Sequence, residues 1–318
     1  MDLAAMSNEA AVVTNKAAPP PTAAIRPPPR CLVVTASNST YMHLLRGCLE
    51  SFASFPGSAG MDVVCFDVGL VQEDRRWLEE RGVRLAEPRT HFGIRPEAFD
   101  RTQLAFLTRP FLPEYFPGYD VYLWLDSDVW LQRWSVVEDY IRGAMTSGMA
   151  IAHERERAYR FQPQLFGWMA KHLVLGYGPV EGARLLLLRP GLNAGLFAIH
   201  VDAPHWGAWA EHFRAAIERT GRISPHDQFA LNRAIHGGVL SRPGFPTAVL
   251  PPTANWICDR GVPMWNDAEG AFCEPYPPFR PIGALHLAGP AKRTEYVIRR
   301  TGGGEFRAAL LYGARPPR

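Results

Sequence analysis

The sequence contains no long apolar run. Its longest apolar candidates are interrupted by Asp, Arg or Pro before they reach the roughly 20 residues that a membrane-spanning helix needs. The first 30 residues are rich in Ala and Pro, and their short apolar runs end before they reach the length of a signal peptide. We therefore expect no transmembrane segment and no secretion. A cytoplasmic protein fits these absences, and peripheral contact with a membrane surface is left open.

The sequence also lacks a surplus of charge and a cysteine pattern. Its 34 Lys and Arg residues nearly balance its 31 Asp and Glu residues, so the net charge of +3 gives no reason to expect nucleic acid as a partner. Any affinity for phosphate must come from a local site. The five cysteines are scattered, odd in number and free of C-x-x-C spacing, which argues against a disulfide framework or a zinc knuckle and favours a reducing compartment.

What the sequence does contain is an alternation of short apolar strands and amphipathic helices. This order predicts an α/β fold with a parallel sheet, and a chain of 318 residues with 47% hydrophobic content can bury a core for it. The expected strands are 31–37, 61–69, 120–131 and 191–200, and the expected helices are 41–52, 71–82, 96–116 with a proline break, 205–220 and a segment that begins near 226.

Composition divides the chain into three expected parts. Residues 1–29 form a Pro-rich and Ala-rich segment with little to pack, and we expect it to be disordered. Residues 30–300 are expected to form a single domain, although Pro, Trp and Gly make regular structure hard to assign beyond residue 237. Residues 301–318 are expected to form a basic tail. Contact of that tail with an anionic membrane is one interpretation, and a solvated tail is the commoner one.

Two aspartates stand two residues apart at the end of an apolar strand. In VYLWLDSDVWL the period of a strand sends the carboxylates of Asp126 and Asp128 to one side and Ser127 to the other. The carboxyl end of a parallel strand is the usual ligand site of an open α/β sheet, and two close carboxylates favour a divalent cation there. The alternative is a strand that ends in a polar turn, where Asp is common.

A second segment near the C-terminus carries residues typical of a phosphate site. In HLAGPAK, His286 and Lys292 stand on either side of a Gly289-Pro290 turn. A neutral imidazole can complete a cation site that carboxylates begin, and a Lys can place positive charge on a diphosphate oxygen. A single His is more often an ordinary core or surface residue, so this segment gains its meaning only beside the aspartate pair.

Taken in order, six short segments resemble the family 8 glycosyltransferases, the group that contains glycogenin and the bacterial lipopolysaccharide galactosyltransferases. The resemblance spans most of the ordered chain and implies a GT-A nucleotide-diphospho-sugar transferase fold, with a mainly parallel central sheet flanked by helices. It also implies a UDP-sugar donor and transfer with retention at the anomeric carbon. The six segments are TASNSTY at 35–41, the basic residue in TRPFLPEYF at 108–116, LDSD at 125–128, LNAGLFAI at 192–199, HDQFALN at 226–232 and HLAGPAK at 286–292.

The resemblance also implies where the donor's nucleotide and diphosphate bind. It places nucleotide contacts at the end of the first strand, where Asn38 can read the base edge and Tyr41 can stack on the base. An ordinary strand-to-helix turn with a Ser or Asn cap is the alternative. Arg109 would face the phosphates, or else sit on a solvated helix end. The full expected set for nucleotide and diphosphate is Ala36, Ser37, Asn38, Tyr41, Arg109, Ser127, Gly289 and Lys292.

Four further positions border the donor sugar by the same resemblance. Asn193 and Gly195 would lie beside it, Gly195 letting a ligand approach the backbone closely, although both could simply end a buried strand. Asp227 would accept hydrogen bonds from the sugar hydroxyls and Gln228 would lie on the reacting face. In the alternative, Ser224 and Asp227 cap the following helix. Asp227, Gln228 and Lys292 are thus the expected catalytic residues, and Asp126, Asp128 and His286 are the expected metal ligands.

Oxygen ligands with one imidazole favour Mn²⁺, with Mg²⁺ as the alternative. Gln228 is a poor nucleophile, so retention is expected to proceed by attack of the acceptor on the face that the diphosphate leaves. Ser39 and Arg293 depart from the usual family pattern, so no subfamily is assigned. Residues 153–186 match no known acceptor motif, and a saccharide, lipid-linked or protein acceptor is left open.

Two other functions are alternatives to glycosyl transfer. A metal-dependent nucleotidyltransferase also uses paired aspartates, but it requires a Gly-rich and basic triphosphate loop early in the chain, and TASNSTY is not one. A catalytically inactive GT-A-like protein that binds nucleotide sugar or carbohydrate has no need of four intact groups at Asp126, Asp128, His286 and Lys292.

Overall fold

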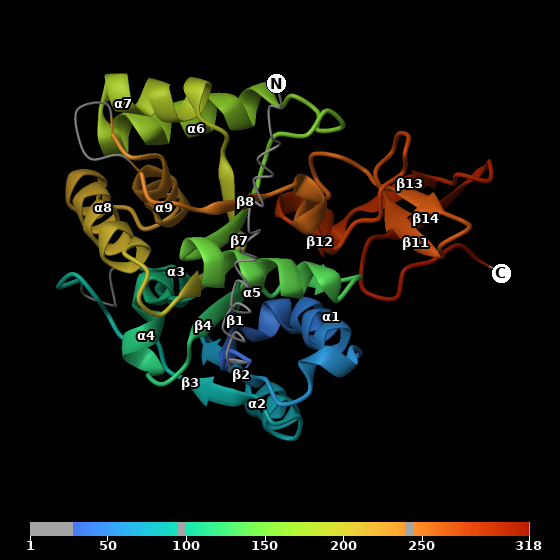
Figure 1. Ribbon diagram of the computed structural model, residues 1–318, viewed down its shortest axis with the longest axis horizontal. Coiled ribbons are helices and arrows are strands. Elements are labelled where there is room, and N and C mark those ends of the chain that lie inside the picture. Colours follow the sequence, from blue (N-terminus) through green and yellow to red (C-terminus); the bar gives the residue numbers. More distant parts are fainter. Residues whose placement is uncertain (1–27, 95–98, 239–243, 318) are drawn as a thin grey trace, which may run out of the picture.

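The computed structural model describes residues 28–94, 99–238 and 244–317. The segment expected to be disordered, residues 1–29, lies outside these ranges except for its last two residues. At the centre is a seven-stranded sheet with strand order β3-β2-β1-β4-β7-β6-β8 (Figure 1). Its strands are β1 Cys31–Ser37, β2 Asp62–Asp67, β3 Arg84–Ala86, β4 Val121–Leu125, β6 Met149–His153, β7 Leu192–His200 and β8 Ala248–Leu250.

The sheet is mainly parallel, as the sequence predicts. Neighbouring strands run parallel from β3 through β2 and β1 to β4, and again from β6 to β8. Only β7 runs the other way, antiparallel to both β4 and β6. The alternation of strands and helices in the first 120 residues produces the parallel half, because each helix carries the chain back to the same end of the sheet.

Helices cover both faces of this sheet (Figure 1). They are α1 Met42–Ala53, α2 Gln72–Glu79, α3 Leu104–Thr108, α4 Leu112–Tyr115, α5 Ser135–Ser147, α6 Pro163–Tyr177, α7 Pro179–Ala183, α8 His205–Thr220 and α9 His226–His236, and a short π-helix spans Arg184–Leu188. Among the described residues no helix is long and apolar enough to cross a bilayer.

Strand β4 shows how the core is divided between the two faces. Tyr122 and Trp124 pack into a cluster with residues of α3 and α8, whereas Val121, Leu123 and Leu125 pack on the opposite face with residues of α1 and α5. This is the two-residue period of a strand buried on both sides. Each of these side chains is almost fully buried, and burial of one large apolar side chain stabilises the fold by about 1.5–3 kcal/mol.

The strand expected at 120–131 is divided in two at the aspartate motif. Strand β4 ends at Leu125, a turn follows, and β5 Val129–Leu131 belongs to a different sheet. The amide of Val129 donates to the carbonyl of Asp126 at 3.0 Å, which closes the turn. The chain leaves the central sheet here because β5 pairs with β12 Ala284–His286, which in turn pairs with β9 Trp256–Ile257. The small sheet therefore brings His286 beside the turn.

The expected basic tail at 301–318 is corrected by the structure. Strand β13 Glu295–Arg299 and strand β14 Glu305–Ala309 form an antiparallel hairpin across the boundary that we expected at residue 300. The side chains of Phe306 and Leu310 are buried, and the indole of Trp130 donates to the carbonyl of Leu310 at 2.8 Å. The hairpin belongs to the orange and red part of Figure 1, beside β11 Ala271–Cys273 and β12. A high basic content hid its alternating apolar positions.

Candidate functional site

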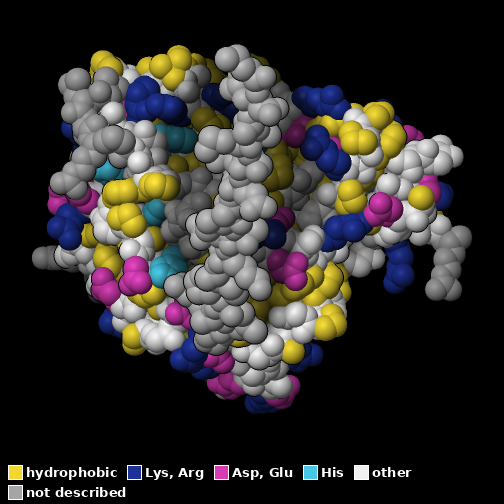
Figure 2. Space-filling model, viewed as in Figure 1, with side chains coloured by type: hydrophobic (Ala, Val, Ile, Leu, Met, Phe, Trp, Pro, Cys, Tyr) yellow, Lys and Arg dark blue, Asp and Glu magenta, His cyan; other side chains and the backbone are white. Residues whose placement is uncertain are grey.

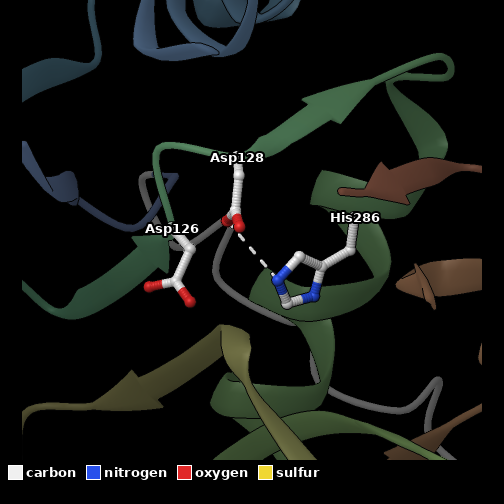
Figure 3. A group of neighbouring side chains, drawn as sticks. All are labelled: Asp126, Asp128 and His286. Atoms are coloured by element: carbon white, nitrogen blue, oxygen red, sulfur yellow. Dashed lines mark ion pairs between the residues drawn. The ribbon is translucent and has the colours of Figure 1, made fainter. Parts of the chain in front are cut away.

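Asp126, Asp128 and His286 meet where β4 ends. Each offers one ligand atom, and these three atoms lie within 4.8 Å of one another. Figure 3 shows the three side chains turned toward a common space, with Nε2 of His286 3.4 Å from Oδ1 of Asp128. The two carboxylates come from the turn between β4 and β5, and the imidazole comes from β12, which pairs with β5. Asp128 and His286 are 158 positions apart in the sequence, and the pairing of β5 with β12 brings them together.

The three groups fit a divalent cation. Two carboxylates and one imidazole form the oxygen-rich set with one nitrogen that Mn²⁺ accepts readily and Mg²⁺ accepts less often. Oδ1 of Asp126 accepts hydrogen bonds from Arg109 and from the indole of Trp124, the latter at 2.7 Å, which leaves Oδ2 for a ligand. The Nδ1 atom of His286 is buried and has no hydrogen-bond partner among the described residues. A cation bound by His286 would supply a partner for this imidazole, one nitrogen of which the described residues leave unpaired.

Arg109 links the aspartate motif to α9. Its guanidinium donates to Asp126 and, at 2.7 Å, to Oδ2 of Asp227. The arginine is only 3% exposed, so the alternative of a solvated helix end is wrong. The guanidinium also lies over the rings of Trp124 and Phe106, at 4.7 and 4.8 Å from their centroids. These contacts fix its position, because a buried guanidinium needs both paired charge and stacked surface.

Asp227 does not cap α9. Helix α9 has Pro225 as its N-cap residue and no side-chain cap, and the Asp227 carboxylate is directed to Arg109 instead. Burial raises the pKa of the Asp227 carboxyl above its ordinary value, against the opposing effect of the Arg109 charge. The alternative of a capping aspartate is therefore wrong, and the residue belongs to a buried charge network that runs back to Asp126.

Lys292 completes the charge balance on the other side of the motif. Its ammonium lies 2.8 Å from Oδ2 of Asp128 and 5.0 Å from the ring centroid of Tyr41. Burial alone would raise the pKa of the Asp128 carboxyl, but His286 and Lys292 hold it below its ordinary value. Burial likewise would lower the pKa of the Lys292 ammonium, but Asp128 raises it. Asp128 therefore stays an anion and Lys292 a cation.

Two cavities meet at the motif. The Tyr41 cavity has a volume of about 210 Å³ and opens beside the ends of β1 and β4. The Gln228 cavity has a volume of about 220 Å³ and lies beside β7 and α9. Arg109 and Asp126 line both cavities, so the two spaces adjoin at the aspartate motif.

The predicted residues divide between these cavities according to their predicted partners. Those assigned to the nucleotide and diphosphate line the Tyr41 cavity, apart from Gly289, which lines neither. Those assigned to the sugar line the Gln228 cavity. The first set is Ala36, Ser37, Asn38, Tyr41, Arg109, Ser127 and Lys292, and the second is Asn193, Gly195, Asp227 and Gln228. The structure thus brings them together in the predicted groups, and their roles stay predictions.

Two of these residues have an additional structural use. The side chain of Asn38 accepts a hydrogen bond from the amide of Tyr41 at 3.2 Å, so it caps the short 3₁₀ turn after β1. Gly289 has a φ of 59°, in the left-handed region that favours glycine, and it begins the 3₁₀ segment Gly289–Arg293 that carries Lys292. Gly289 therefore directs the chain toward Lys292, and its contact with the donor stays a prediction.

A buried network behind the Gln228 cavity was not predicted from the sequence. Glu154 follows the last residue of β6 and accepts hydrogen bonds from Arg260 at 2.9 Å, Asn193 at 2.8 Å and Gln228 at 3.3 Å. Burial alone would raise the pKa of the Glu154 carboxyl, but Arg260 and then Asn193 lower it. The carboxylate therefore holds two of the predicted sugar-binding residues. Its place directly after an apolar strand was the available signal.

The chain is similar to known proteins in its fold but not in its sequence. No family model matches the sequence, and no curated protein does. Among solved structures, the chain superposes on the bifunctional glycosyltransferase WbbM with a TM-score of 0.50 and 13% identity, over 82% of this chain and 46% of that one.

Two further solved structures give similar values. For the galactosyltransferase LgtC in complex with donor and acceptor sugar analogs, the TM-score is 0.49 at 17% identity, over 82% of this chain and 88% of that one. For mouse xyloside xylosyltransferase 1 the TM-score is 0.48 at 16% identity, over 81% and 96%. With its mainly parallel sheet, the chain therefore has the GT-A fold of such glycosyltransferases.

Proposed function

We propose that the chain is a metal-dependent, retaining glycosyltransferase whose donor is a nucleotide-diphosphate sugar, namely a UDP-sugar. The observation that carries the proposal is the meeting of Asp126, Asp128 and His286 at the point where the Tyr41 and Gln228 cavities adjoin. A nucleotide sugar has a base and ribose at one end, a sugar at the other and a diphosphate between them. Two cavities with a cation site at their junction match that order. The GT-A fold supports the same assignment.

In this proposal the cation would be Mn²⁺, with Mg²⁺ as the alternative, held by Asp126, Asp128 and His286. Bound there, it would supply positive charge to the diphosphate as the leaving group departs. Lys292 would stabilise the same growing charge, since its ammonium is held beside Asp128 and lines the Tyr41 cavity. Arg109 would keep Asp126 and Asp227 at a fixed separation while both cavities are filled.

The sugar would lie in the Gln228 cavity. The amide oxygen of Gln228 accepts a hydrogen bond from the amide of Ala194 at 3.0 Å, and its nitrogen donates to Glu154, so the side chain has a fixed direction. An amide is a poor nucleophile, which favours direct attack by the acceptor hydroxyl. The bond from the anomeric carbon to the phosphate oxygen breaks, and a bond to the acceptor oxygen forms on the same face. The departing phosphate oxygen takes the acceptor's proton.

Donor hydrolysis without an acceptor tests this proposal. A panel of nucleotide sugars is incubated with the parent chain in Mn²⁺, in Mg²⁺ and in chelator, and released sugar and nucleotide are measured. We expect hydrolysis of a UDP-sugar that depends on the cation and is lost in Asp128→Asn. Cation-dependent binding without any release would instead support the rival, an inactive nucleotide-sugar-binding protein. If no nucleotide sugar of the panel binds, the proposed donor is wrong.

A further inference from the structure

The segment from Phe161 to Leu188 exposes an unusual amount of apolar surface. Eight of the fourteen large hydrophobic side chains that are exposed among the described residues lie within it. Phe161 and Leu188 are 73% and 72% exposed. The eight are Phe161, Phe166, Trp168, Val174, Leu175, Val180, Leu187 and Leu188. Isolated exposed apolar residues need no explanation, but a cluster of this size marks an interaction surface.

The apolar residues of α6 are divided between an inner and an outer side. Leu173 is buried in a small cluster with Leu185 and Phe229, and the intermediate side chain of Met169 packs against it. Trp168 and Leu175 are exposed, and at 100° per residue they lie within one outward stripe of the helix together with Lys171. The inner side explains why α6 packs on the fold. The outer side stays accessible, since Trp168 is 43% and Leu175 is 46% exposed, although the ring of Trp168 also lies beside that of Phe229.

Charge on this surface has one sign. Among residues 155–189 the exposed charged side chains are all basic, namely Arg155, Arg157, Arg160, Lys171 and Arg189. The two half-buried acids of this range each form a hydrogen bond or an ion pair within the chain. Glu156 accepts a hydrogen bond from the hydroxyl of Tyr276, and Glu181 pairs with Arg184 at 2.5 Å. We call the eight apolar and five basic residues the α6–α7 face. Figure 2 shows yellow and dark blue side chains together over α6 and α7.

The α6–α7 face adjoins the candidate site. A cavity of about 510 Å³ is lined by Phe161 and Phe166 of this face and by three of its four arginines, Arg155, Arg157 and Arg160. The same cavity shares Leu165, Met169 and Arg260 with the Gln228 cavity. A partner that covers the face would therefore lie at the entrance to the space beside Gln228.

We propose that the α6–α7 face docks on the surface of an anionic lipid bilayer. Exposed Phe, Trp and Leu side chains bury apolar area at the boundary of head groups and acyl chains, and Lys and Arg around them are attracted to anionic head groups. Each basic side chain near such a surface adds to the attraction, and no exposed acid of residues 155–189 opposes it. A second copy of the chain would bring five like charges against five, which disfavours self-association through this face.

Vesicle co-sedimentation of the full chain tests the proposal and needs no nucleotide sugar, so it is independent of the proposed activity. We expect the parent to sediment with phosphatidylcholine vesicles that contain phosphatidylglycerol, and far less with phosphatidylcholine alone. Leu188→Asp and Phe161→Asp should each weaken partition about tenfold, because a charge replaces an inserted apolar side chain. Leu188 is 72% and Phe161 73% exposed, and the ring contact of Phe161 is with Phe166 of the same face, so neither change disturbs the core.

Two matched controls distinguish this face from general surface effects. Val71 is 55% exposed at the start of α2, outside the face, and Val71→Asp should leave partition unchanged. Arg189→Glu should reduce binding to the anionic vesicles and its salt dependence, whereas Arg76→Glu on α2 should not. The proposal is overturned if the parent ignores both vesicle types, or if Val71→Asp weakens binding as much as Leu188→Asp. It is also overturned if light scattering shows that Leu188→Asp dissociates a dimer of the parent.

Discussion

The imidazole of His286 fills the space that a side chain on Gly195 would need. A Cβ built on Gly195 would lie 2.4 Å from Cε1 of His286 and 3.0 Å from Oδ2 of Asp126. Carbon atoms that are not bonded do not approach so closely, and β7 and β12 are each held by strand pairing on both sides. The missing side chain at residue 195 is therefore a condition for bringing a cation ligand from β12 against the aspartate motif.

Gly195→Ala should consequently reduce cation binding while the chain still folds. The added methyl group has to displace the imidazole of His286, and displacement of a ligand typically lowers metal affinity about 10-fold to 100-fold. Titration of Mn²⁺ in the presence of UDP, by calorimetry, measures the effect. Gly207→Ala in α8 is the matched control, since a Cβ there meets no atom within 4 Å. Unchanged affinity in Gly195→Ala would show that His286 is not a ligand.

Asp128→Asn should remove cation-dependent donor binding. The substitution keeps the shape of a side chain that contacts both His286 and Lys292, but it removes the negative charge that a divalent cation requires. Calorimetry of UDP-sugar binding with and without Mn²⁺ should show that the cation no longer improves affinity. Asp139→Asn, whose side chain is 46% exposed and pairs with Arg142, serves as the control and should behave like the parent. A cation effect that survives in Asp128→Asn would contradict the assignment.

The parts of the fold that sequence predicts well are those with a local pattern. The alternation of apolar strands and amphipathic helices gives the parallel half of the sheet, and the uninterrupted run at 191–200 gives β7 almost to the residue. The break of the strand at Asp126 could not be predicted in this way. It depends on the pairing of β5 with β12, which begins 153 positions after β5 ends, and local periodicity carries no information about such pairing.

The same distinction holds for the candidate site. Asp126 and Asp128 stand out because two carboxylates at a strand end are chemically unusual, and His286 and Lys292 stand out beside a Gly-Pro turn. Glu154 follows an apolar strand, but neither it nor Arg260 belongs to a recognisable motif, because each is an ordinary polar residue until the fold places them 2.9 Å apart in the interior. Only burial makes their ion pair part of the site, and burial of a charge depends on tertiary packing.

Glu154→Gln should disturb the Gln228 cavity and lower stability. The amide cannot neutralise the guanidinium of Arg260. If its oxygen keeps the hydrogen bonds that Asn193 and Gln228 donate to Oε1, its NH₂ group takes the place of Oε2 and cannot accept from Arg260. Loss of a buried charge partner costs about 3 kcal/mol of unfolding free energy, measured by denaturant titration. Glu87→Gln is the control, because the pair of Glu87 with Arg101 is exposed and is worth less than about 1 kcal/mol. Equal stability of the two variants would refute the role of Glu154.

Stability should fall between pH 6.5 and pH 5 because two buried histidines stay neutral in the folded chain. Burial lowers the pKa of His205 and of His226 from 6.5 to about 4. The unfolded chain therefore binds more protons in this range, so the stabilisation is complete above pH 6.5 and is lost as the pH falls toward 4. The expected slope is about 1 kcal/mol per pH unit for each histidine.

The non-titrating variant His205→Gln isolates one of these contributions. Nε2 of His205 lies 3.0 Å from the hydroxyl of Thr247, and the residue is 1% exposed. Denaturant titration at pH 5 and at pH 6.5 should show a smaller difference for this variant than for the parent, whatever its absolute stability. The same difference in both proteins would mean that His205 takes up its proton in the folded state.

The role of Lys292 separates an enzyme from a protein that only binds. If its ammonium stabilises the charge that grows on the diphosphate, the contact strengthens as the bond breaks, so Lys292→Ala should lower kcat more than it weakens donor binding. Deletion of one such electrostatic group typically costs about 100-fold in kcat. The measurements are steady-state donor hydrolysis and equilibrium donor affinity, both in Mn²⁺. Lys171→Ala is the control, because Lys171 lies on the exposed side of α6 and lines neither the Tyr41 nor the Gln228 cavity.

The pattern of losses decides between the two roles. Lys292 is tied to Asp128 in the free protein, so its removal also leaves that carboxylate without its ammonium partner. A change in donor affinity alone would therefore reflect the altered cation site. A fall in kcat at saturating donor, with affinity nearly kept, can arise only from a contact that matters more in the transition state. Equal losses in affinity and kcat/KM with kcat untouched would mean that Lys292 merely holds the donor, and its catalytic role would be withdrawn.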